Sequence, residues 1–405
     1  MNTVYRNISE VLTLSSAAKK DGRNLLPEDC SILKNATVVF NSEEVLWVGH
    51  DGDLPSNLLE GSKVIDLSNK VLTPEMVDSH THAIFGGNRA EEYSMRLNGA
   101  DYQAIAKAGG GILSTSKGTN SLSADELFNI TSERIERIAS YGIGTIEIKS
   151  GYALNYESEK ICSEVIDRLK KHFHPRVNIF NTFLAAHAVP KEFETSTDYL
   201  TSVVIPLLKE LAPKKIIDAV DIFHEEGYFT LEDTRLLFEE SKKLNLEVKI
   251  HADEFGDNGG AIIASKFGAL SADHLLCTGD EGIKALAKSS TVATVLPGTG
   301  WFLGKPQANA KRMLDSGCKV SIASDYNPGS CHCDNLLLIA SMAAPMYPMN
   351  MAQMWSAITL NAAASLGISN QGSIEVGKAP RFTIFDVKSV SEITYNWGRN
   401  LAVSI

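Results

Sequence analysis

The sequence predicts an α/β protein: a (β/α)8 TIM-like barrel with a small β-sandwich domain formed by both chain ends. Strand-length apolar runs alternate with amphipathic helical segments in the middle of the chain. Both ends contain short β-rich runs, and histidines and acidic residues follow the apolar runs of the middle. The chain has 405 residues, which is long enough for a large core or for two domains.

The two ends of the chain are expected to form β structure together. In residues 1–73 the β-rich runs, separated by turn-like polar residues, are Ala36–Asn41, Glu44–Gly49 and Ser62–Leu67. Gly372–Val387 has the same character, with Gly and Pro between runs of strand length. We therefore expect residues 1–73 and 372–405 to share the β-sandwich domain and residues 74–371 to form the barrel.

Eight apolar runs of strand length predict the barrel strands, and amphipathic segments between most of them predict its helices. The strand candidates are Met76–Asp78, Thr145–Lys149, Val177–Phe183, Ala219–Phe223, Glu247–Ile250, Leu270–Ala272, Thr291–Leu296 and Lys319–Ala323. Helix candidates include Ala124–Tyr141, Glu157–His172, Leu231–Leu244 and Gly279–Lys288. An open doubly wound sheet is the alternative that this alternation leaves open.

Composition narrows the class of protein. The net charge of −11 argues against a nucleic-acid partner, which needs a basic surface. No uncharged apolar run approaches the roughly 20 residues that cross a bilayer, and Met1–Ser9 lacks the pattern of a signal peptide. Six scattered cysteines do not suggest a disulfide framework, so we expect a cytoplasmic protein without a membrane partner.

His80-Thr81-His82 follows the first strand candidate and is the most informative motif. Residues two apart on a strand point to the same side, so both imidazoles can bind one metal ion. In a (β/α)8 barrel the active site lies at the carboxyl ends of the strands. Further side chains follow later strands, namely Tyr152, His187, His251, Glu254, His274 and Asp325.

Imidazole and carboxylate ligands suit Zn²⁺ and iron, and three histidines with one aspartate and an open position are typical of a catalytic site. The competing interpretation is that each histidine is structural, and for His187 or His274 alone it is the better one. Convergence on one metal explains the set better. Cys331-His332-Cys333 is a second candidate motif, but without another cysteine pair we interpret it as structural or incidental.

The order His-x-His, two later strand-end histidines and a final aspartate resembles the amidohydrolase superfamily, over the whole chain. Longer stretches are similar to the imidazolonepropionase family, and these are Asp78–Ala90, Ala108–Thr115, Glu147–Leu154, His251–Phe255 and Ser324–Ser330. The resemblance implies hydrolysis of 4-imidazolone-5-propanoate to N-formimidoyl-L-glutamate in histidine degradation. It also implies a homodimer.

The resemblance assigns roles to individual residues. One Zn²⁺ or Fe³⁺ per subunit would be held by His80, His82, His251 and Asp325. Arg89 would bind the propionate, because a guanidinium pairs with a carboxylate in a bidentate way. The rest of the substrate pocket would comprise Tyr152, His187, Glu254, Asn327, Gly329 and Ser330. The catalytic groups would be Glu254, His274 and Asp325, which move protons and polarise the scissile carbonyl.

Three alternatives remain open at this stage. Arg89 can instead form a surface salt bridge with Glu91 or Glu92. Binuclear relatives carry a modified lysine at the end of strand 4, where this chain has His224-Glu225-Glu226; Lys149 ends strand 2 instead. One metal is therefore expected, with a bridging Glu225 as a minor alternative. The rival functions are another amidohydrolase, such as a guanine or cytosine deaminase, and a non-catalytic barrel that only binds a metal or small ligand.

Overall fold

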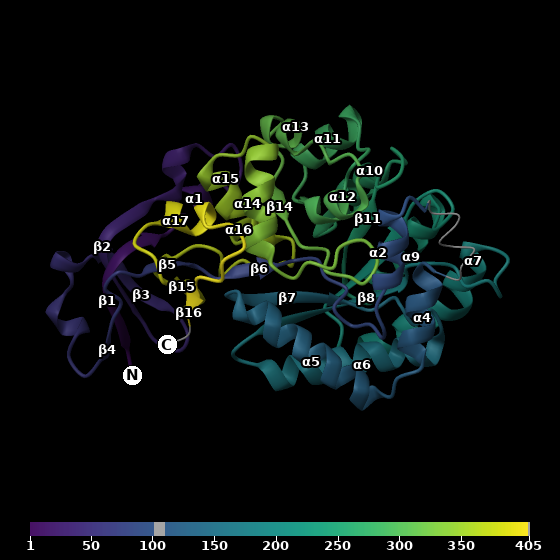
Figure 1. Ribbon diagram of the computed structural model, residues 1–405, viewed down its shortest axis with the longest axis horizontal. Helices are drawn as coiled ribbons and strands as arrows, with labels where there is room; N and C mark the ends of the chain where they lie inside the picture. The colour runs from purple at the N-terminus through teal and green to yellow at the C-terminus, as the bar shows by residue number, and fades with distance from the viewer. Residues whose placement is uncertain (101–109, 404–405) are drawn as a thin grey trace.

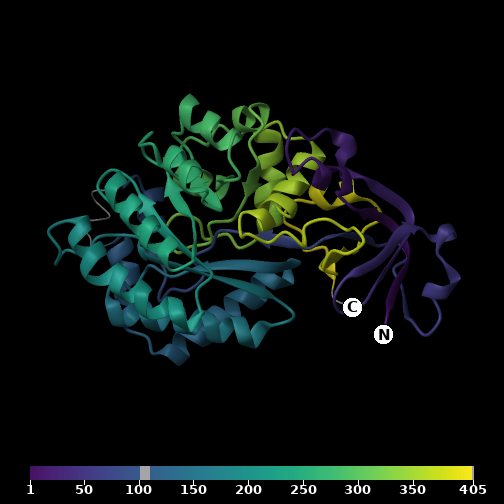
Figure 2. The ribbon, with the colours of Figure 1, turned by 180° about the vertical axis from the view of Figure 1, so that it is seen from behind.

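The computed structural model describes residues 1–100 and 110–403 (Figure 1). Ala108 and Gly109, which belong to one of the quoted motifs, lie outside the described residues. Figure 1 shows a β-sheet that contains both chain ends beside a larger unit in which strands and helices alternate. The helices surround the strands of this larger unit, and Figure 2 shows the same arrangement from behind.

Strands from both chain ends form one sheet of seven strands within the described part of the chain. Its order is β16-β15-β5-β1-β2-β3, and β4 also pairs with β1. The strands are β1 (Thr3–Leu12), β2 (Ile32–Phe40), β3 (Val45–His50), β4 (Lys63–Asp66), β5 (Val71–Pro74), β15 (Phe382–Phe385) and β16 (Ala402–Val403). The antiparallel pairing of β15 with β5 joins the two chain ends, as the sequence predicts.

This sheet curls around a small core. The rings of Phe40 on β2 and Phe382 on β15 are 5.2 Å apart, although β5 and β1 lie between their strands. Neighbouring strands are about 4.8 Å apart, so a flat sheet would separate these two strands by much more. Apolar side chains including Ile8, Val38 and Leu72 are buried inside the curl. The expected β-sandwich domain is thus a sheet packed against itself.

The larger unit contains the predicted parallel barrel, whose strands occur in sequence order from β6 to β14. The strands are β6 (Met76–Asp78), β7 (Ile143–Lys149), β8 (Asn178–Ala186), β9 (Ala219–His224), β10 (Glu247–Val248), β11 (Ile250–Ala252), β12 (Ser271–His274), β13 (Val292–Val295) and β14 (Val320–Ile322). β10 and β11 together correspond to the fifth predicted strand. This sequential order excludes the doubly wound alternative, because such a sheet reverses its strand order.

The barrel closes where its first and last strands extend beyond their regular ends. The backbone N–H of Asp325 donates to the carbonyl of His80 at 3.0 Å, and that of His82 donates to Tyr326 at 2.9 Å. Thr81 and Tyr326 form a parallel bridge at the same place. Closure therefore brings the His80-Thr81-His82 motif beside Asp325, although more than half of the chain separates them.

The predicted helices are present within a residue or two at each end. They are α5 (Ala124–Ser140), α6 (Tyr156–Phe173), α9 (Leu231–Lys243) and α11 (Asp280–Ala287). Capping sets some of these boundaries: the side chains of Ser123 and Thr230 accept backbone N–H groups of the first turns of α5 and α9. Such caps stabilise a helix by about 1 kcal/mol.

The remaining helices cover the barrel and the junction with the sheet. They are α1 (Ser15–Lys19), α2 (Ala90–Leu97), α4 (Ile112–Asn120), α7 (Ser196–Tyr199), α8 (Ile205–Leu211), α10 (Gly260–Phe267), α12 (Pro297–Leu303), α13 (Ala310–Asp315), α14 (Leu336–Met346), α15 (Met351–Ala357), α16 (Leu360–Ala364) and α17 (Val390–Tyr395). Short 3-10 turns occur at Pro27–Cys30, Asp51–Asp53, Ser56–Leu58 and Ala212–Lys214, with a π-type turn at Leu200–Val204.

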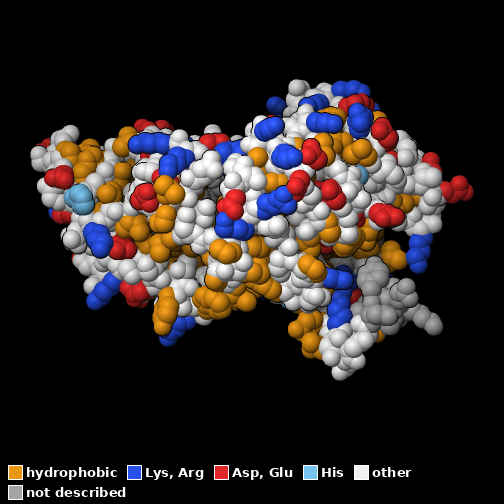
Figure 3. All heavy atoms as spheres, turned by 90° about the horizontal axis from the view of Figure 1, so that it is seen from above, with side chains coloured by type: hydrophobic (Ala, Val, Ile, Leu, Met, Phe, Trp, Pro, Cys, Tyr) orange, Lys and Arg blue, Asp and Glu red, His pale blue; other side chains and the backbone are white. Residues whose placement is uncertain are grey.

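The surface carries charges of both signs. Figure 3 shows acidic and basic side chains intermixed over the face seen from above, with apolar side chains gathered near its lower middle. Of the helices in the described ranges, none has both the length and the apolar character needed to cross a bilayer.

Candidate metal centre and active site

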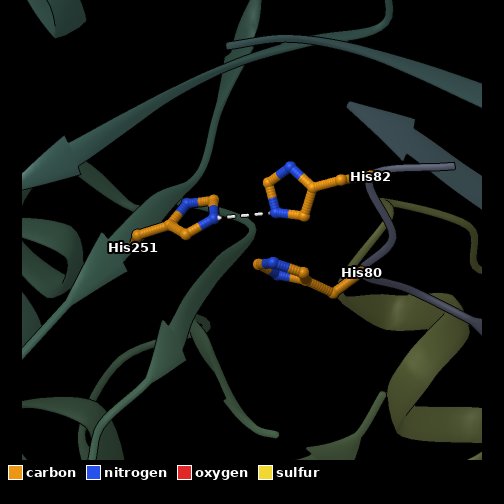
Figure 4. Close-up of side chains that lie close together, drawn as sticks. All are labelled: His80, His82 and His251. Atoms are coloured by element: carbon orange, nitrogen blue, oxygen red, sulfur yellow. Dashed lines mark hydrogen bonds between the residues drawn. The ribbon is translucent and has the colours of Figure 1, made fainter. Parts of the chain in front are cut away.

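Three histidines meet at the carboxyl ends of the barrel strands. His80 and His82 follow β6, and His251 lies on β11, so rigid backbone positions each ring. One ring nitrogen from each lies within 4.8 Å of the other two, and all three side chains are buried. The Nε2 atoms of His82 and His251 are 3.4 Å apart. Figure 4 shows the three rings gathered around one point.

Asp325 completes this group from the end of β14. Its Oδ1 atom is 3.5 Å from Nε2 of His80 and 3.5 Å from Nε2 of His82. Its other oxygen accepts a 2.7 Å hydrogen bond from the hydroxyl of Thr299, which fixes the carboxylate. Asp325 also has a backbone φ of 50°, an uncommon conformation for a residue with a side chain. Such conformations cluster at functional sites.

The spacing and the unsatisfied atoms of this group fit a bound cation. A tetrahedral ion held at about 2.1 Å separates its ligand atoms by roughly 3.4 Å. The measured separations are 3.4, 3.5 and 3.5 Å. His80 Nε2 and Asp325 Oδ1 are buried and have no hydrogen-bond partner among the described residues. Buried polar atoms are normally satisfied, so this pair of atoms fits the binding of a positive ion.

Two further carboxylates face the outer nitrogens of the ligand rings. Oδ2 of Asp273 on β12 is 2.7 Å from Nδ1 of His80, and Oδ2 of Asp221 on β9 is 3.1 Å from Nδ1 of His251. A carboxylate at Nδ1 keeps the proton there and leaves Nε2 free to bind metal. Burial, together with the charge of Lys149, lowers the pKa of His80 well below its usual range, which favours the neutral ligand form.

A completely buried charge network lies next to these carboxylates. Lys149 Nζ is 2.7 Å from Asp221 and 2.9 Å from Glu147, and Lys249 Nζ is 2.9 Å from Glu147. Burial would lower the pKa of Lys149, but Asp221, Glu147 and Asp273 raise it above its usual value. His80, Glu147 and Asp273 also have metal-ligand spacing. Two lysine ammonium groups already pair with these carboxylates, and their positive charge opposes the binding of another cation at this second group.

Glu254 and His274 lie together beside the metal ligands. Oε2 of Glu254 is 3.7 Å from Nε2 of His274, and the His274 ring centroid is 5.2 Å from that of His251. Burial raises the pKa of Glu254 to about 8, and the carboxylates of Asp325 and Glu225 add to this rise. Glu254 can therefore both accept and release a proton near neutral pH.

The predicted pocket residues Tyr152 and His187 pack against the metal ligands. His187 stacks on His82 with ring centroids 5.1 Å apart, and Tyr152 lies 5.2 Å from His187. Glu159, which sequence reasoning missed, fixes this wall by accepting the backbone N–H groups of Gly151, Ala153 and Leu154. The site therefore has a rigid aromatic side.

Arg89 lies at another side of the site, against the loop that begins with Asp325. Its Nη1 atom would be 1.9 Å from a Cβ atom built on Gly329, so this close approach requires glycine. Asn327 holds the loop, because its Oδ1 atom accepts the N–H groups of Gly329 and Ser330 at 2.7 Å each. Arg89 does pair with Glu92, at 2.7 Å, but both side chains are largely buried, at 12% and 11% exposure, so this is not a surface salt bridge.

Several residues at or beside the site were not predicted, namely Asp221, Asp273, Lys249 and Glu159. A signal existed for some of them. Asp221 and Lys249 interrupt apolar strand runs, and a charged residue inside such a run points to a paired group in the barrel interior. Cys331 and Cys333 belong to neither group with metal-ligand spacing within the described ranges, and Cys331 is buried.

Comparison with known proteins places this geometry in a family. The model of the amidohydrolase family matches residues 71–403. An imidazolonepropionase of Clostridium tetani is 37% identical over 407 residues, covering 100% of this chain and 96% of that protein. An imidazolonepropionase of Bacillus velezensis is also 37% identical, over 99% of this chain and 94% of its own length.

Solved structures support the fold. The zinc complex of atrazine chlorohydrolase from Arthrobacter aurescens matches with a TM-score of 0.70 and 14% identity, covering 96% of this chain and 88% of that one. A guanine deaminase from C. acetobutylicum matches with a TM-score of 0.69 and 15% identity, over 97% and 94% of the two chains. These identities support a shared architecture only. The similarity in sequence shows the family as well as the architecture. The chain belongs to the amidohydrolase family and, within it, to the imidazolonepropionases.

Proposed function

We propose that this protein hydrolyses the cyclic amide of 4-imidazolone-5-propanoate to N-formimidoyl-L-glutamate, a step of histidine degradation. The imidazolonepropionase relatives support this substrate. One observation carries the proposal: the loop from Asp325 to Ser330 supplies one of the four converging donors, Asp325, and meets the Arg89 guanidinium a few residues later, at Gly329. Hydrolytic groups and a carboxylate-binding group therefore flank one site.

The proposed cofactor is one Zn²⁺ or Fe³⁺ per subunit, held by His80, His82, His251 and Asp325. When bound, such an ion lowers the pKa of a coordinated water towards about 7 and polarises a carbonyl oxygen. The buried lysines near Asp273 and Glu147 support a single ion, because their positive charge occupies the second group of carboxylates and opposes another cation there.

Arg89 is proposed to hold the propionate group of the substrate. A guanidinium binds a carboxylate through two parallel hydrogen bonds, which fixes both position and orientation. Tyr152, His187, Glu254, Asn327, Gly329 and Ser330 would line the rest of the pocket. With the carboxylate held at one end, the ring carbonyl is directed towards the histidines at the other, and this positioning itself accelerates the reaction.

Glu254 is proposed as the main proton carrier. It takes a proton from the attacking water as the new C–O bond forms at the ring carbonyl carbon. It then gives a proton to the ring nitrogen as the C–N bond breaks, so protons balance over the reaction. Burial raises the pKa of Glu254 above that of an exposed glutamate, so its carboxyl can hold the proton between the two steps. His274 would donate a hydrogen bond to the developing oxyanion, and Asp325 is the other catalytic carboxylate and the second candidate for the base.

The same proposal includes the setting of the enzyme. The substrate is a small molecule that carries a carboxylate, and the protein acts in the cytoplasm as a homodimer, with neither nucleic acid nor membrane as a partner. Residues 1–73 with 372–405 form its β-sandwich domain, and residues 74–371 form the catalytic barrel. Sedimentation of the purified protein at several concentrations tests the dimer directly.

Product analysis tests the function. Purified, metal-loaded protein is incubated separately with 4-imidazolone-5-propanoate, guanine and cytosine, and the products are identified by mass spectrometry. The expected result is N-formimidoyl-L-glutamate from the first substrate and no ammonia from the nucleobases. Ammonia release from a nucleobase, without ring opening of the imidazolone, would assign the protein to the deaminases instead.

An Arg89→Ala variant tests the assignment of the carboxylate. Loss of a charged hydrogen-bonding group costs about 1.5–3 kcal/mol, which corresponds to a rise in KM of roughly 10- to 150-fold. The kcat value should change much less, because Arg89 does not touch the reacting bond. If this variant kept the wild-type kcat/KM, the proposed role of Arg89 in binding the substrate would be wrong.

A further inference from the structure

Glu225 bonds directly to the backbone of the proposed proton carrier. It follows β9, its side chain is buried, and its Oε2 atom accepts the N–H groups of Glu254 and Phe255 at 2.9 Å each. Its Oε1 atom accepts a hydrogen bond from the side-chain amide of Asn258. A single carboxylate thus holds three points of the segment that follows β11.

Other contacts hold this segment mainly at its two ends. At Glu254 itself they are long, since the Cys277 thiol is 3.6 Å from its carbonyl oxygen and His274 Nε2 is 3.7 Å from its carboxylate. Asp253 accepts the N–H of Gly260 at 3.0 Å and the hydroxyl of Thr278 at 2.8 Å, which ties the segment to α10 and to the loop after β12. Phe255 is 60% exposed, so burial of its side chain contributes little to holding this part of the segment. The position of Glu254 therefore depends strongly on the two N–H bonds to Glu225.

We propose that Glu225 is a positioning residue that fixes Glu254 beside His274. This inference rests on the proposed role of Glu254 in the reaction. A carboxylate that accepts two backbone N–H groups stabilises one placement of that backbone, and charged acceptors make hydrogen bonds about twice as strong as neutral ones. A misplacement of a reacting group by about 1 Å can cost roughly 100-fold in rate.

The contacts of Glu225 also argue against the alternative that it is a bridging metal ligand. Both of its oxygens already accept hydrogen bonds from N–H donors of Glu254, Phe255 and Asn258. Within the described ranges, Glu225 belongs to neither group of side chains with metal-ligand spacing. A ligand role would require it to release these partly buried donors and lose their hydrogen bonds.

Two substitutions separate the shape of Glu225 from its charge. Glu225→Ala removes both N–H bonds. Glu225→Gln keeps one oxygen that can accept both N–H groups, provided that the side-chain amide of Asn258 rotates to present its oxygen to the new amide group. This variant also tests the proposal if the alanine variant fails to fold. Glu226→Ala is the matched control, because Glu226 is the adjacent glutamate and is exposed.

The experiment measures three quantities on the metal-loaded full chain: amide hydrogen exchange at residues 254 and 255, metal content, and kcat and KM for 4-imidazolone-5-propanoate. Loss of two hydrogen bonds in Glu225→Ala should speed this exchange by about tenfold or more. The kcat value should fall by about 10- to 100-fold with KM within about twofold. Metal content should stay at the wild-type value, Glu225→Gln should be intermediate, and Glu226→Ala should match wild type.

Each contrary outcome has a distinct meaning. Unchanged exchange in both Glu225 variants would overturn the positioning role, and so would faster exchange with wild-type kcat. Loss of metal from Glu225→Gln would make Glu225 a ligand and would likewise overturn it. If wild-type protein does not open the imidazolone ring, the proposed function fails, and the exchange rates alone then decide whether Glu225 holds this segment.

Discussion

The Nδ1 atom of His80 lies 2.7 Å from Oδ2 of Asp273, and both side chains are completely buried. His80 follows the first barrel strand and Asp273 lies on the sixth, so the contact crosses the interior of the barrel. It directs the other ring nitrogen of His80 towards His82 and Asp325. A buried carboxylate thereby orients a histidine of the proposed metal centre.

The first prediction concerns Asp273→Asn. The amide can no longer hold the proton on Nδ1 of His80 by charge, so the ligand ring loses its fixed orientation. Outer contacts of this kind contribute about 10- to 100-fold to metal affinity, and a loss of that size is expected in competition with a chelator. Asp386→Asn is the control, because Asp386 is 62% exposed on the sheet. Equal metal affinity in both variants would refute the orienting role.

The second prediction concerns Lys149→Met. Methionine has a similar length, but it leaves Asp221 and Glu147 buried with less compensating charge. Removal of one partner from a buried ion pair costs about 3–5 kcal/mol in free energy of unfolding. Urea denaturation measures this value. Lys171→Met, in which an exposed pair with Asp167 is lost, should cost less than about 1 kcal/mol. A similar small cost for Lys149→Met would show that the network contributes little.

The third prediction concerns Gly329→Ala. The added Cβ atom would lie 1.9 Å from Nη1 of Arg89, so the guanidinium must move. Only the end of a flexible side chain is displaced, so thermal stability should change little, while KM should rise about tenfold through loss of one charged hydrogen bond. Gly52→Ala is the control, because a Cβ atom there meets nothing within 4 Å. An unchanged KM in Gly329→Ala would show that Arg89 does not bind the substrate carboxylate.

The fourth prediction concerns pH and the stability of the metal-free protein. The folded protein raises the pKa of Glu254 from 4.5 to about 8 and so binds this proton more tightly than the unfolded chain. The contribution of Glu254 is fully present below pH 4.5 and is lost as pH rises through about 8. Between these pH values, the difference in free energy of unfolding between wild type and Glu254→Gln should fall by up to about 1.4 kcal/mol per pH unit. Urea denaturation across this range measures the difference, and a flat difference would contradict the shifted pKa.

Local patterns in the sequence were sufficient to predict the barrel and the side chains that converge at the ends of its strands. Strand-length apolar runs and strand-end histidines are both visible in one stretch of chain. The end of the sixth strand was placed too early, at Ala272 instead of His274, because the prediction followed apolar residues. Asp273 can lie in the barrel interior because Lys149 and Lys249, both within 4 Å of its carboxylate, compensate its negative charge.

The supporting carboxylates could not be predicted in the same way. Asp273 meets His80, which is far away in sequence, and Glu225 meets the backbone of Glu254. Such contacts depend on the register of neighbouring strands and on the path of loops, which no single stretch of sequence records. The pairing of Arg89 with Glu92 was foreseen as an alternative, but its burial against Gly329 depends on the closure of the barrel.

One bound metal ion is proposed to make this protein a hydrolase of 4-imidazolone-5-propanoate. The most direct measurement is a titration of metal-free protein with Zn²⁺ and, separately, with Fe³⁺, in which formation of N-formimidoyl-L-glutamate is followed at each step. We expect no turnover without metal, and turnover that rises in proportion to added metal until a plateau at one equivalent per chain. Turnover that needs two equivalents, or no ring opening at any metal loading, would contradict it.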